Sequence, residues 1–529
     1  MIKKFNTALD SIKNLTSRGL FTDAHKSIDK LLKQNPTSKE LLNTKATIFT
    51  FQGFFNESLK LLQKCISLYP NDSETFYNLG VAYHNSNQQD LAIESFENCI
   101  KNDSTNVDAY VNLTRILIHT FSIRNALATI NSLSDQNAQL EICYHLQAQC
   151  FRLINDFENQ KNSLEIAIKI NPSNANNFIY LAFIFLWKNN PTKAKEYFKK
   201  ALELNPKNTF AIYNLMEIDK NFEYYSNLEL LIKINERYHL SDFDLIYFNL
   251  CLSKFYENKD EEKYIDYLFK ANKLKKQTIN FDINYFLNIN EQIFDKYHCL
   301  TNTPSAFKEY KPIFIVGLPR SGSSITEQIL INSPDVQSCG EVEILNYEFM
   351  NNLNSLNENI LNNIGNKYLN HIKLITNSKI FIDKLPLNFF WIGLIKIIFP
   401  QAKFIFTSRN IFDNCFSIFK TFFGDSALPF SYNVKDIRNF YNLHVSIIDS
   451  WIALLDKHLH KFEYEKLIAN PEDEVMKLFN FLELKYDRSY LNLNNSDNFI
   501  QTASFSQARN KIEKQASYKK YHKFFPDFL

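Results

Sequence analysis

A pattern of proline and small residues recurs every 34 residues through the first part of the chain. Prolines mark one point of the unit, at Pro36, Pro70, Pro172 and Pro206. Another point carries mostly small residues, at Ala24, Ser58, Ala92, Ala126, Gln160 and Ala194. Four residues later a large apolar residue follows, at Ile28, Leu62, Phe96, Ile130, Leu164 and Phe198. The unit predicts a helical hairpin, because small residues let two helices approach and a proline ends the second helix.

Stacked hairpins form a solenoid, because one hairpin cannot bury its apolar stripe alone. The pattern resembles the tetratricopeptide repeat family over about residues 5–207, and Asp244–Lys276 resembles one more, degenerate unit. We therefore expect an all-α solenoid over residues 1–276. The resemblance implies that a protein or peptide binds in the groove of the solenoid. The alternative is that the array only orients the rest of the chain.

The pattern of apolar residues changes after this array. Residues 277–310 still read as a helical linker, which the polar, proline-containing stretch Thr301–Pro304 interrupts. Short apolar runs then alternate with helical segments, and these runs are 313–317, 380–383 and 403–408. Buried runs of this kind are typical of parallel strands joined by crossover helices. Residues 311–529 are therefore predicted to form an α/β domain with a parallel sheet.

The composition excludes several other classes of protein. The 529 residues carry a net charge of +2, which gives no case for a nucleic-acid or membrane-surface partner. The eight cysteines are scattered, without the spacing of a disulfide framework or a zinc site. No stretch reaches the roughly 20 apolar residues of a membrane-spanning helix. We expect a cytoplasmic protein that needs no metal.

The segment from Gly317 to Ser324 follows the first predicted strand and opens a helix. Backbone N–H groups at such a corner point at one spot and bind an anion. The spacing matches the Walker A pattern of ATP-binding loops, but Ser323 replaces the lysine that such loops place on the terminal phosphates. Arg320, inside the loop, offers a fork of donors suited to phosphate or sulfate.

The loop resembles the 5′-phosphosulfate-binding motif of the sulfotransferase family. That resemblance implies 3′-phosphoadenosine 5′-phosphosulfate as co-substrate, bound by Arg320, Ser321, Gly322, Ser323 and Ser324. A second segment supports it, because Arg409 follows a predicted strand and Ser417 lies eight residues on in a helix. The family's 3′-phosphate motif has that arginine, that serine and that spacing.

The reacting centre needs a base on the acceptor hydroxyl and a cation on the leaving oxygen. Gly340-Glu341 resembles the catalytic segment of tyrosylprotein sulfotransferases, which implies Glu341 as the base and leaves Glu343 as the alternative. Lys384, at the end of a predicted strand, resembles the family lysine that reaches the bridging oxygen. Together with Arg320, these are the predicted catalytic residues.

Two further nucleotide contacts are implied by the resemblance. Tyr464 matches a tyrosine near the adenine, although a core aromatic is the alternative. Arg509, in a basic C-terminal segment, matches the arginine that closes over the 3′-phosphate.

The sequence thus predicts a sulfotransferase that modifies a hydroxyl group. The resemblance suggests a protein tyrosine as acceptor, while carbohydrate and small-molecule hydroxyls stay open. The competing hypotheses are a P-loop kinase or NTPase, and a non-enzymatic repeat scaffold with an inactive sulfotransferase-like domain.

Overall fold

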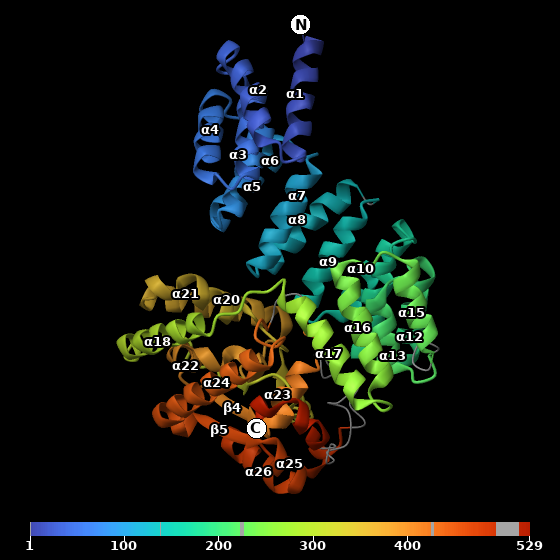
Figure 1. Ribbon diagram of the computed structural model, residues 1–529. Helices are drawn as coiled ribbons and strands as arrows, with labels where there is room; N and C mark the ends of the chain where they lie inside the picture. Colours follow the sequence, from blue (N-terminus) through green and yellow to red (C-terminus); the bar gives the residue numbers. More distant parts are fainter. Residues whose placement is uncertain (1, 138, 223–226, 425–427, 494–517) are drawn as a thin grey trace. The chain divides into compact units, whose positions relative to one another are not determined.

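Paired α-helices follow one another from the N-terminus in the computed structural model, which describes residues 2–137, 139–222, 227–424, 428–493 and 518–529 (Figure 1). The chain divides into two units, Met1–Leu153 and Ile154–Leu529. The helices of the first unit are α1 (Ile2–Ser17), α2 (Phe21–Gln34), α3 (Lys39–Phe51), α4 (Phe55–Leu68), α5 (Ser73–Asn85), α6 (Gln89–Asn102), α7 (Val107–His119), α8 (Ile123–Gln136) and α9 (Glu141–Leu153).

The repeats continue in the second unit. Their helices there are α10 (Phe157–Ile170), α11 (Ala175–Trp187), α12 (Pro191–Leu204), α13 (Thr209–Ile218), α15 (Leu228–Arg237), α16 (Asp242–Tyr256) and α17 (Glu261–Lys276). The degenerate hairpin predicted at Asp244–Lys276 corresponds to α16 and α17, whereas the sequence pattern did not predict α13 or α15. The predicted all-α solenoid is confirmed.

Three sequence positions, each repeated on the 34-residue grid, explain why the hairpins form. The first helix of a hairpin begins at a side-chain N-cap, which is Ser38, Asp72, Asn106, Asn174 or Asn208. The turn between the helices has a residue with positive φ, which is Gly19, Gly53, Asn87, Phe121, Asn155 or Asn189. A second small position, in the first helix of the hairpin at Ala46, Gly80, Ala148 and Ala182, allows close packing: a Cβ on Gly80 would lie 2.7 Å from the Phe96 ring.

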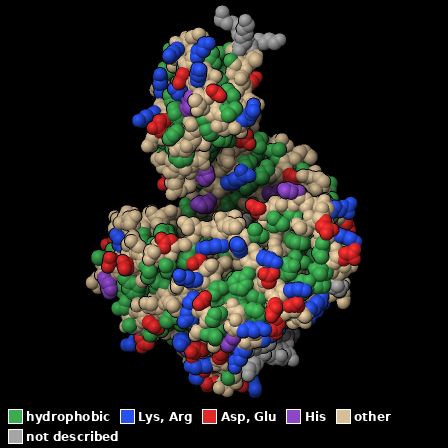
Figure 2. All heavy atoms as spheres, viewed as in Figure 1, with side chains coloured by type: hydrophobic (Ala, Val, Ile, Leu, Met, Phe, Trp, Pro, Cys, Tyr) green, Lys and Arg blue, Asp and Glu red, His purple; other side chains and the backbone are tan. Residues whose placement is uncertain are grey.

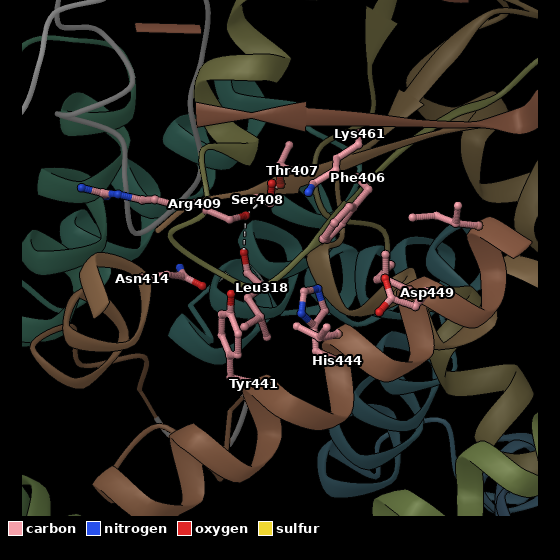
Figure 3. Close-up of a pocket in the computed structure, with 14 residues that line it drawn as sticks. Leu318, Phe406, Thr407, Ser408, Arg409, Asn414, Tyr441, His444, Asp449 and Lys461 are labelled. Carbon is pink, nitrogen blue, oxygen red and sulfur yellow. Dashed lines mark hydrogen bonds between the residues drawn. The ribbon is translucent and has the colours of Figure 1, made fainter. Parts of the chain in front are cut away.

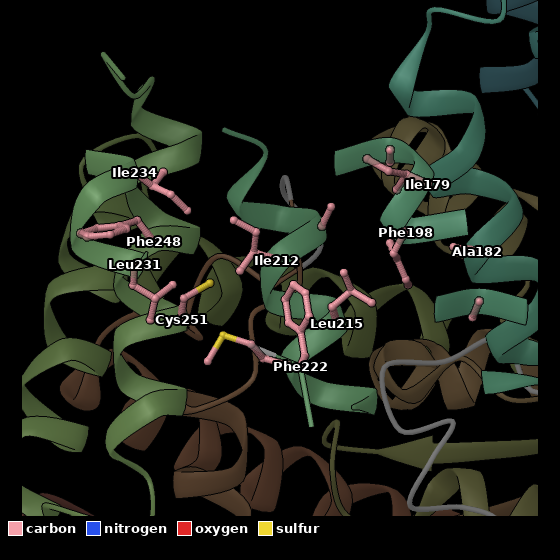
Figure 4. Packing of buried hydrophobic residues seen from close by; sticks show 14 of the residues in the cluster. Ile179, Ala182, Phe198, Ile212, Leu215, Phe222, Leu231, Ile234, Phe248 and Cys251 are labelled. Atoms are coloured by element: carbon pink, nitrogen blue, oxygen red, sulfur yellow. The ribbon is translucent and has the colours of Figure 1, made fainter. Parts of the chain in front are cut away.

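The last repeats share one apolar core within the second unit. Figure 4 shows Ile212 and Leu215 of α13 between side chains of α11 and α12 and side chains of α15 and α16. The core residues of this cluster include Phe198, Phe222 and Cys251, all buried. The helices that the sequence pattern missed are therefore held by the same kind of packing as the regular repeats.

The remainder of the second unit is an α/β domain. Its strands are β1 (Ile313–Gly317), β2 (Gln337–Ser338), β3 (Phe381–Asp383), β4 (Lys403–Ser408) and β5 (Leu459–Glu463), parallel in the order β2-β3-β1-β4-β5. Its α-helices are α18 (Ile283–Leu300), α19 (Ser323–Ile331), α20 (Ile344–Asn352), α21 (Glu358–Ile375), α22 (Ile392–Ile398), α23 (Ile411–Phe419), α24 (Val434–Leu455), α25 (Tyr464–Ala469) and α26 (Pro471–Leu482). Short 3₁₀ helices are η1 (Leu353–Ser355), η2 (Pro386–Trp391), η3 (Asp456–His458), η4 (Arg488–Leu491), η6 (Tyr518–Phe524) and η7 (Pro526–Phe528). The predicted parallel α/β sheet is confirmed.

Both faces of this sheet are covered. Ile315 of β1 and Ile405 of β4 pack against α19 and α26, in one cluster of buried residues. On the other face Phe314 stacks on Phe404, with ring centroids 5.5 Å apart, and Tyr368 of α21 lies beside them. Because the carboxyl ends of parallel strands meet at one edge, ligands of such sheets bind there.

The last repeat and the C-terminal residues meet the α/β domain at α23. The ring of Phe269 in α17 stacks on Phe525, with centroids 5.4 Å apart. Asn272 Nδ2 of α17 donates a hydrogen bond of 3.1 Å to the Phe419 carbonyl at the end of α23. Phe525, which is fully buried, also packs against the ring of Phe419. Helix α23 is therefore fixed from the repeat side.

Charged side chains of both signs are interspersed over the face seen in Figure 2. This agrees with the net charge of +2. Among the helices that the structure describes, none is long and apolar enough to cross a membrane. None of the eight cysteines is in a disulfide, and all except Cys299 are buried.

Candidate functional site

The loop after β1 has a strained backbone. Arg320 has φ +68°, a left-handed conformation that a residue with a Cβ adopts at a cost. Ser321 Oγ donates to the Leu318 carbonyl at 2.6 Å and lies 2.8 Å from Thr407 Oγ1 of β4. Its buried side chain therefore holds the loop. Ser323 and Ser324, also buried, are the first residues of α19.

The two motifs that the sequence analysis singled out meet in space. Arg320 Nε donates to Ser417 Oγ of α23 at 3.2 Å, although the two residues are 97 positions apart. Asn414 Nδ2, also on α23, donates to the Pro319 carbonyl of the loop at 2.9 Å. Ser417 is fully buried. These two hydrogen bonds thus hold the loop after β1 against α23.

Arg409 lies at the end of β4, between two tyrosine rings. Its Cζ atom is 4.9 Å from the ring centroid of Tyr464 and 5.9 Å from that of Tyr518. Tyr464 also borders the loop, since a Cβ on Gly322 would lie 3.2 Å from its Cδ2. Arg409 Nε is buried and has no hydrogen-bond partner in the described part of the chain. An unpaired buried donor of this kind fits an anionic ligand.

Tyr518 stands among three cations, and the sequence analysis did not predict it. Lys420 Nζ lies 4.6 Å from its ring centroid. Burial by itself would raise the pKa of Tyr518, but the charges of Lys420, Arg409 and Arg320 lower it overall. Burial also lowers the pKa of Arg320, to about 10, and the neighbouring Arg409 contributes to the decrease. The local excess of positive charge fits a multiply charged phosphate better than a neutral ligand.

A second group of charges lies at the ends of β2 and β3. Lys384, with 1 % of its side chain exposed, pairs with Glu341, and its Nζ lies 3.9 Å from Glu327 Oε2 of α19. Burial would lower the pKa of Lys384, but Glu341 and Glu327 raise it overall. Burial raises the pKa of Glu327, and Ser338 hydrogen-bonds to its carboxylate. The sequence analysis did not predict Glu327 as a site residue. Its position among the apolar residues of 325–331 indicates a buried carboxylate and could have identified it.

The alternative base, Glu343, occupies a different position. It is exposed and directly precedes α20, whereas Glu341 faces Lys384. Beneath them, Asp383 is fully buried and accepts hydrogen bonds from Tyr368 Oη at 2.9 Å and from the Leu385 N–H at 3.2 Å. Burial raises the pKa of Asp383 to about 7, and these hydrogen bonds partly offset the increase.

A cavity of about 210 Å³ lies beside the loop, between β4, β5 and α24 (Figure 3). Tyr441, His444 and Asp449 of α24 line it, and burial lowers the pKa of His444 to about 3. In Figure 3 the side chain of Arg409 extends away from these residues of α24. Among the described residues, those lining the cavity do not include Glu341 or Lys384.

One predicted residue cannot be placed. Arg509 lies in 494–517, outside the described residues. The others fall into two groups. The first group lies around the loop after β1 and consists of residues 320–324, Arg409, Ser417 and Tyr464. The second group lies at the ends of β2 and β3 and consists of Glu341 and Lys384. No group of three or more His, Cys, Asp or Glu side chains is arranged to hold a metal in the ranges that the structure describes.

The fold and these contacts define an α/β domain whose loop after β1 is held against α23, joined to a helical repeat array. Residues 312–488 match the model of the sulfotransferase family, and residues 61–94 and 175–208 match tetratricopeptide repeat models. The chain thus combines tetratricopeptide repeats with a domain of the sulfotransferase family.

Two relatives share part of the sequence. An uncharacterized protein of Aquifex aeolicus (strain VF5) is 28 % identical over 298 residues, which are 50 % of this chain and 38 % of the relative. A protein named as a putative protein-tyrosine sulfotransferase of Caenorhabditis briggsae is 24 % identical over 232 residues, 39 % of this chain and 78 % of the relative. The chain therefore matches well under half of the Aquifex protein's length.

Solved structures resemble parts of the chain only loosely. MamA (41-end) from Desulfovibrio magneticus RS-1 superposes with a TM-score of 0.30 at 20 % identity, covering 32 % of this chain and 95 % of that one. PilW, described as a type IV pilus biogenesis factor, has a TM-score of 0.35 at 16 % identity, covering 40 % of this chain and 97 % of that one.

Proposed function

We propose that this protein transfers a sulfuryl group from 3′-phosphoadenosine 5′-phosphosulfate to a hydroxyl acceptor. The observation that carries the proposal is the hydrogen bond between Arg320 and Ser417, at 3.2 Å. It joins the loop suited to the 5′-phosphosulfate and the helix suited to the 3′-phosphate. ATP carries no 3′-phosphate, so an ATP site does not need the anion-binding residues Arg409 and Ser417. Ser323 also replaces the lysine that an ATP-binding loop of this type requires.

Recognition of the nucleotide is assigned to the first group of residues. The backbone N–H groups of residues 321–324 and the start of α19 hold the 5′ end. Ser417 and Arg409 hold the 3′-phosphate, and the unpaired Arg409 Nε supplies a donor that this phosphate satisfies. Tyr464 borders the adenine side. Arg509 stays a prediction for closure over the 3′-phosphate.

The reaction is assigned to the second group of residues. When bound, the nucleotide supplies a sulfuryl group attached to a phosphate leaving group. Glu341 accepts the proton of the acceptor hydroxyl as its oxygen bonds to sulfur. Lys384 stabilises the negative charge that develops on the bridging oxygen as the sulfur–oxygen bond breaks, and Arg320 lies on the same phosphate. In this step the Lys384 ammonium exchanges its contact with Glu341 for a contact with the bridging oxygen. The carboxylate of Glu327 stays beside the ammonium throughout.

The acceptor we propose is a tyrosine hydroxyl in a protein or peptide that the repeat groove presents. Two findings support this finer proposal, namely the tetratricopeptide repeats and the name of the Caenorhabditis briggsae relative. The eight unpaired cysteines support a reducing, cytoplasmic location.

Calorimetry with 3′-phosphoadenosine 5′-phosphate tests nucleotide recognition. We expect Arg320→Ala to weaken binding at least tenfold, because it removes a charged donor from both halves of the site. Arg488→Ala is the matched control, since Arg488 is 80 % exposed, and its affinity should equal that of the wild type. Equal affinities for Arg320→Ala and the wild type would show that this loop is not the nucleotide site. Tighter binding of ATP would favour a kinase or NTPase instead.

Transfer itself is tested by incubating a lysate with the enzyme and labelled co-substrate. Mass spectrometry of the labelled products identifies the acceptor, and sulfate on tyrosine is the expected result. Sulfate on sugars or small molecules would correct the acceptor class. Nucleotide binding without transfer to any pool would favour the inactive-scaffold hypothesis.

A further inference from the structure

The turns of the repeats have a common backbone requirement. Asn87, Phe121, Asn155 and Asn189 occupy equivalent turns, with φ values of +59°, +58°, +57° and +55°. Asparagine and glycine adopt this left-handed conformation at the least cost. Turn geometry alone therefore explains the asparagines at Asn87, Asn155 and Asn189, and a contact made by one side chain needs a separate explanation.

Asn155, two residues before the start of α10, makes such a contact. Its Nδ2 donates a hydrogen bond of 3.0 Å to the carbonyl of Cys339. The two residues are 184 positions apart and lie in the same structural unit, Ile154–Leu529. Cys339 is buried and directly precedes Gly340-Glu341. The repeat turn thus reaches the segment that carries the candidate base.

The loop around Gly340 is held on its other side by the sheet. The Lys384 N–H donates to the Gly340 carbonyl at 2.8 Å, and the Cys339 N–H donates to the Ile382 carbonyl at 2.8 Å. Gly340 has φ +71°, and a Cβ there would lie 3.7 Å from Asn155 Nδ2. The loop therefore packs directly on the Asn155 amide.

From this geometry we infer that Asn155 is a positioning residue, which fixes the loop 339–341 so that Glu341 faces Lys384 and the acceptor hydroxyl. The inference rests on the proposed function and deepens it, because it makes the repeats part of the active site. The amide acts through the backbone of the loop and does not touch the reacting atoms. Asn155 therefore affects the chemical step and leaves nucleotide binding at Arg320 and Ser417 unchanged.

The repeats also act on the nucleotide loop through their charges. Burial lowers the pKa of Arg320, whereas the charges of Tyr213 and Glu217 on α13 act in the opposite direction.

The test compares Asn155→Gly with Asn189→Gly in the full chain. Both variants keep a residue suited to the left-handed turn, and only the first removes the donor to Cys339. Asn155→Asp is the near-isosteric variant, since a carboxylate cannot donate to a carbonyl. Three quantities are measured: hydrogen–deuterium exchange of residues 338–342, affinity for 3′-phosphoadenosine 5′-phosphate, and kcat with KM for sulfate transfer.

We expect faster exchange of residues 338–342 in both Asn155 variants and wild-type exchange in Asn189→Gly. The kcat of the two Asn155 variants should fall on the order of tenfold, equivalent to about 1.4 kcal/mol, and their affinity for 3′-phosphoadenosine 5′-phosphate should be unchanged. The inference is wrong if Asn155→Gly and Asn189→Gly match in exchange and in kcat. If the wild type transfers no sulfate, the proposed function fails, while the exchange data still decide whether Asn155 fixes the loop.

Discussion

Replacing Glu341 by glutamine separates catalysis from stability at this site. The substitution keeps the size of the side chain and its ability to accept a hydrogen bond from Lys384, but removes the proton-accepting carboxylate. Loss of a general base costs about 10²- to 10⁴-fold in rate. We therefore expect kcat to fall by that factor and affinity for 3′-phosphoadenosine 5′-phosphate to stay within about twofold.

The expected loss of stability is small, for a reason visible in the structure. Glu341 has 41 % of its side chain exposed, so solvent screens its pairing with Lys384. Lys384 itself is buried, and removing the sole partner of a buried charge costs about 3–5 kcal/mol. Here Glu327 Oε2 stays 3.9 Å from the ammonium, so the charge remains paired. The free energy of unfolding should therefore change by about 1 kcal/mol or less.

The assay is the initial rate of sulfate transfer from labelled co-substrate, combined with urea unfolding of the same preparations. Glu343→Gln is the matched control, because Glu343 is exposed and directly precedes α20. Its rate should stay within a few-fold of the wild type. A Glu341→Gln enzyme with wild-type kcat would refute the assignment, and loss of rate in Glu343→Gln alone would make Glu343 the base. A loss of several kcal/mol in Glu341→Gln would refute the role given to Glu327.

Three further substitutions test other parts of the site. Ser417→Ala removes the hydroxyl assigned to the 3′-phosphate and should weaken binding of 3′-phosphoadenosine 5′-phosphate about 5- to 10-fold in calorimetry. Adenosine 5′-phosphosulfate, without a 3′-phosphate, should be unaffected, and equal losses for both ligands would contradict the role of Ser417. Asp383→Asn removes a carboxyl with a pKa of about 7, against roughly 3.9 when unfolded. The raised value means that the folded wild type loses stability as pH rises from about 4 through 7, so urea unfolding at pH 5 and 8 should show a smaller loss for Asp383→Asn. Equal losses would contradict the buried titration. Phe525→Ala empties a fully buried ring site and should cost about 3–5 kcal/mol in urea unfolding, whereas half-buried Phe524→Ala should cost clearly less. Equal costs would contradict the packing of Phe525 against α17 and α23.

The sequence predicted the elements whose pattern is local. β1 and β4 coincide with the apolar runs 313–317 and 403–408, because both strands are buried on two faces. β2 has two residues, too few to show a period, and β5 has only two buried residues, Leu459 and Phe462, so it forms no continuous apolar run. α15 was missed because the 34-residue grid ends at Pro206, after which packing in the cluster around Leu215 decides the structure.

The residues of the candidate site also differ in whether a local pattern in the sequence identifies them. Arg320, Arg409 and Ser417 could be read from motifs, since the loop and the strand end fix their positions locally. Tyr518 and Asn155 could not, because their roles depend on contacts with residues far along the chain. Glu327 stood out only as a glutamate among apolar residues, and its partner Lys384 could not be read from that pattern. No pattern in the sequence indicates that a repeat turn lies against the Cys339 carbonyl.

The placement of residues 518–529 has a consequence for synthesis of the protein. This segment lies between α17 and α23, where Phe525 contacts Phe269 and Phe419, and Tyr518 reaches Arg409 and Lys420. A ribosome produces Ser417 and its helix about a hundred residues before this segment emerges. A nascent chain that has not reached residue 518 therefore contains every strand of the sheet but lacks the Phe525 ring that packs on α23 and the Tyr518 ring beside Arg409 and Lys420.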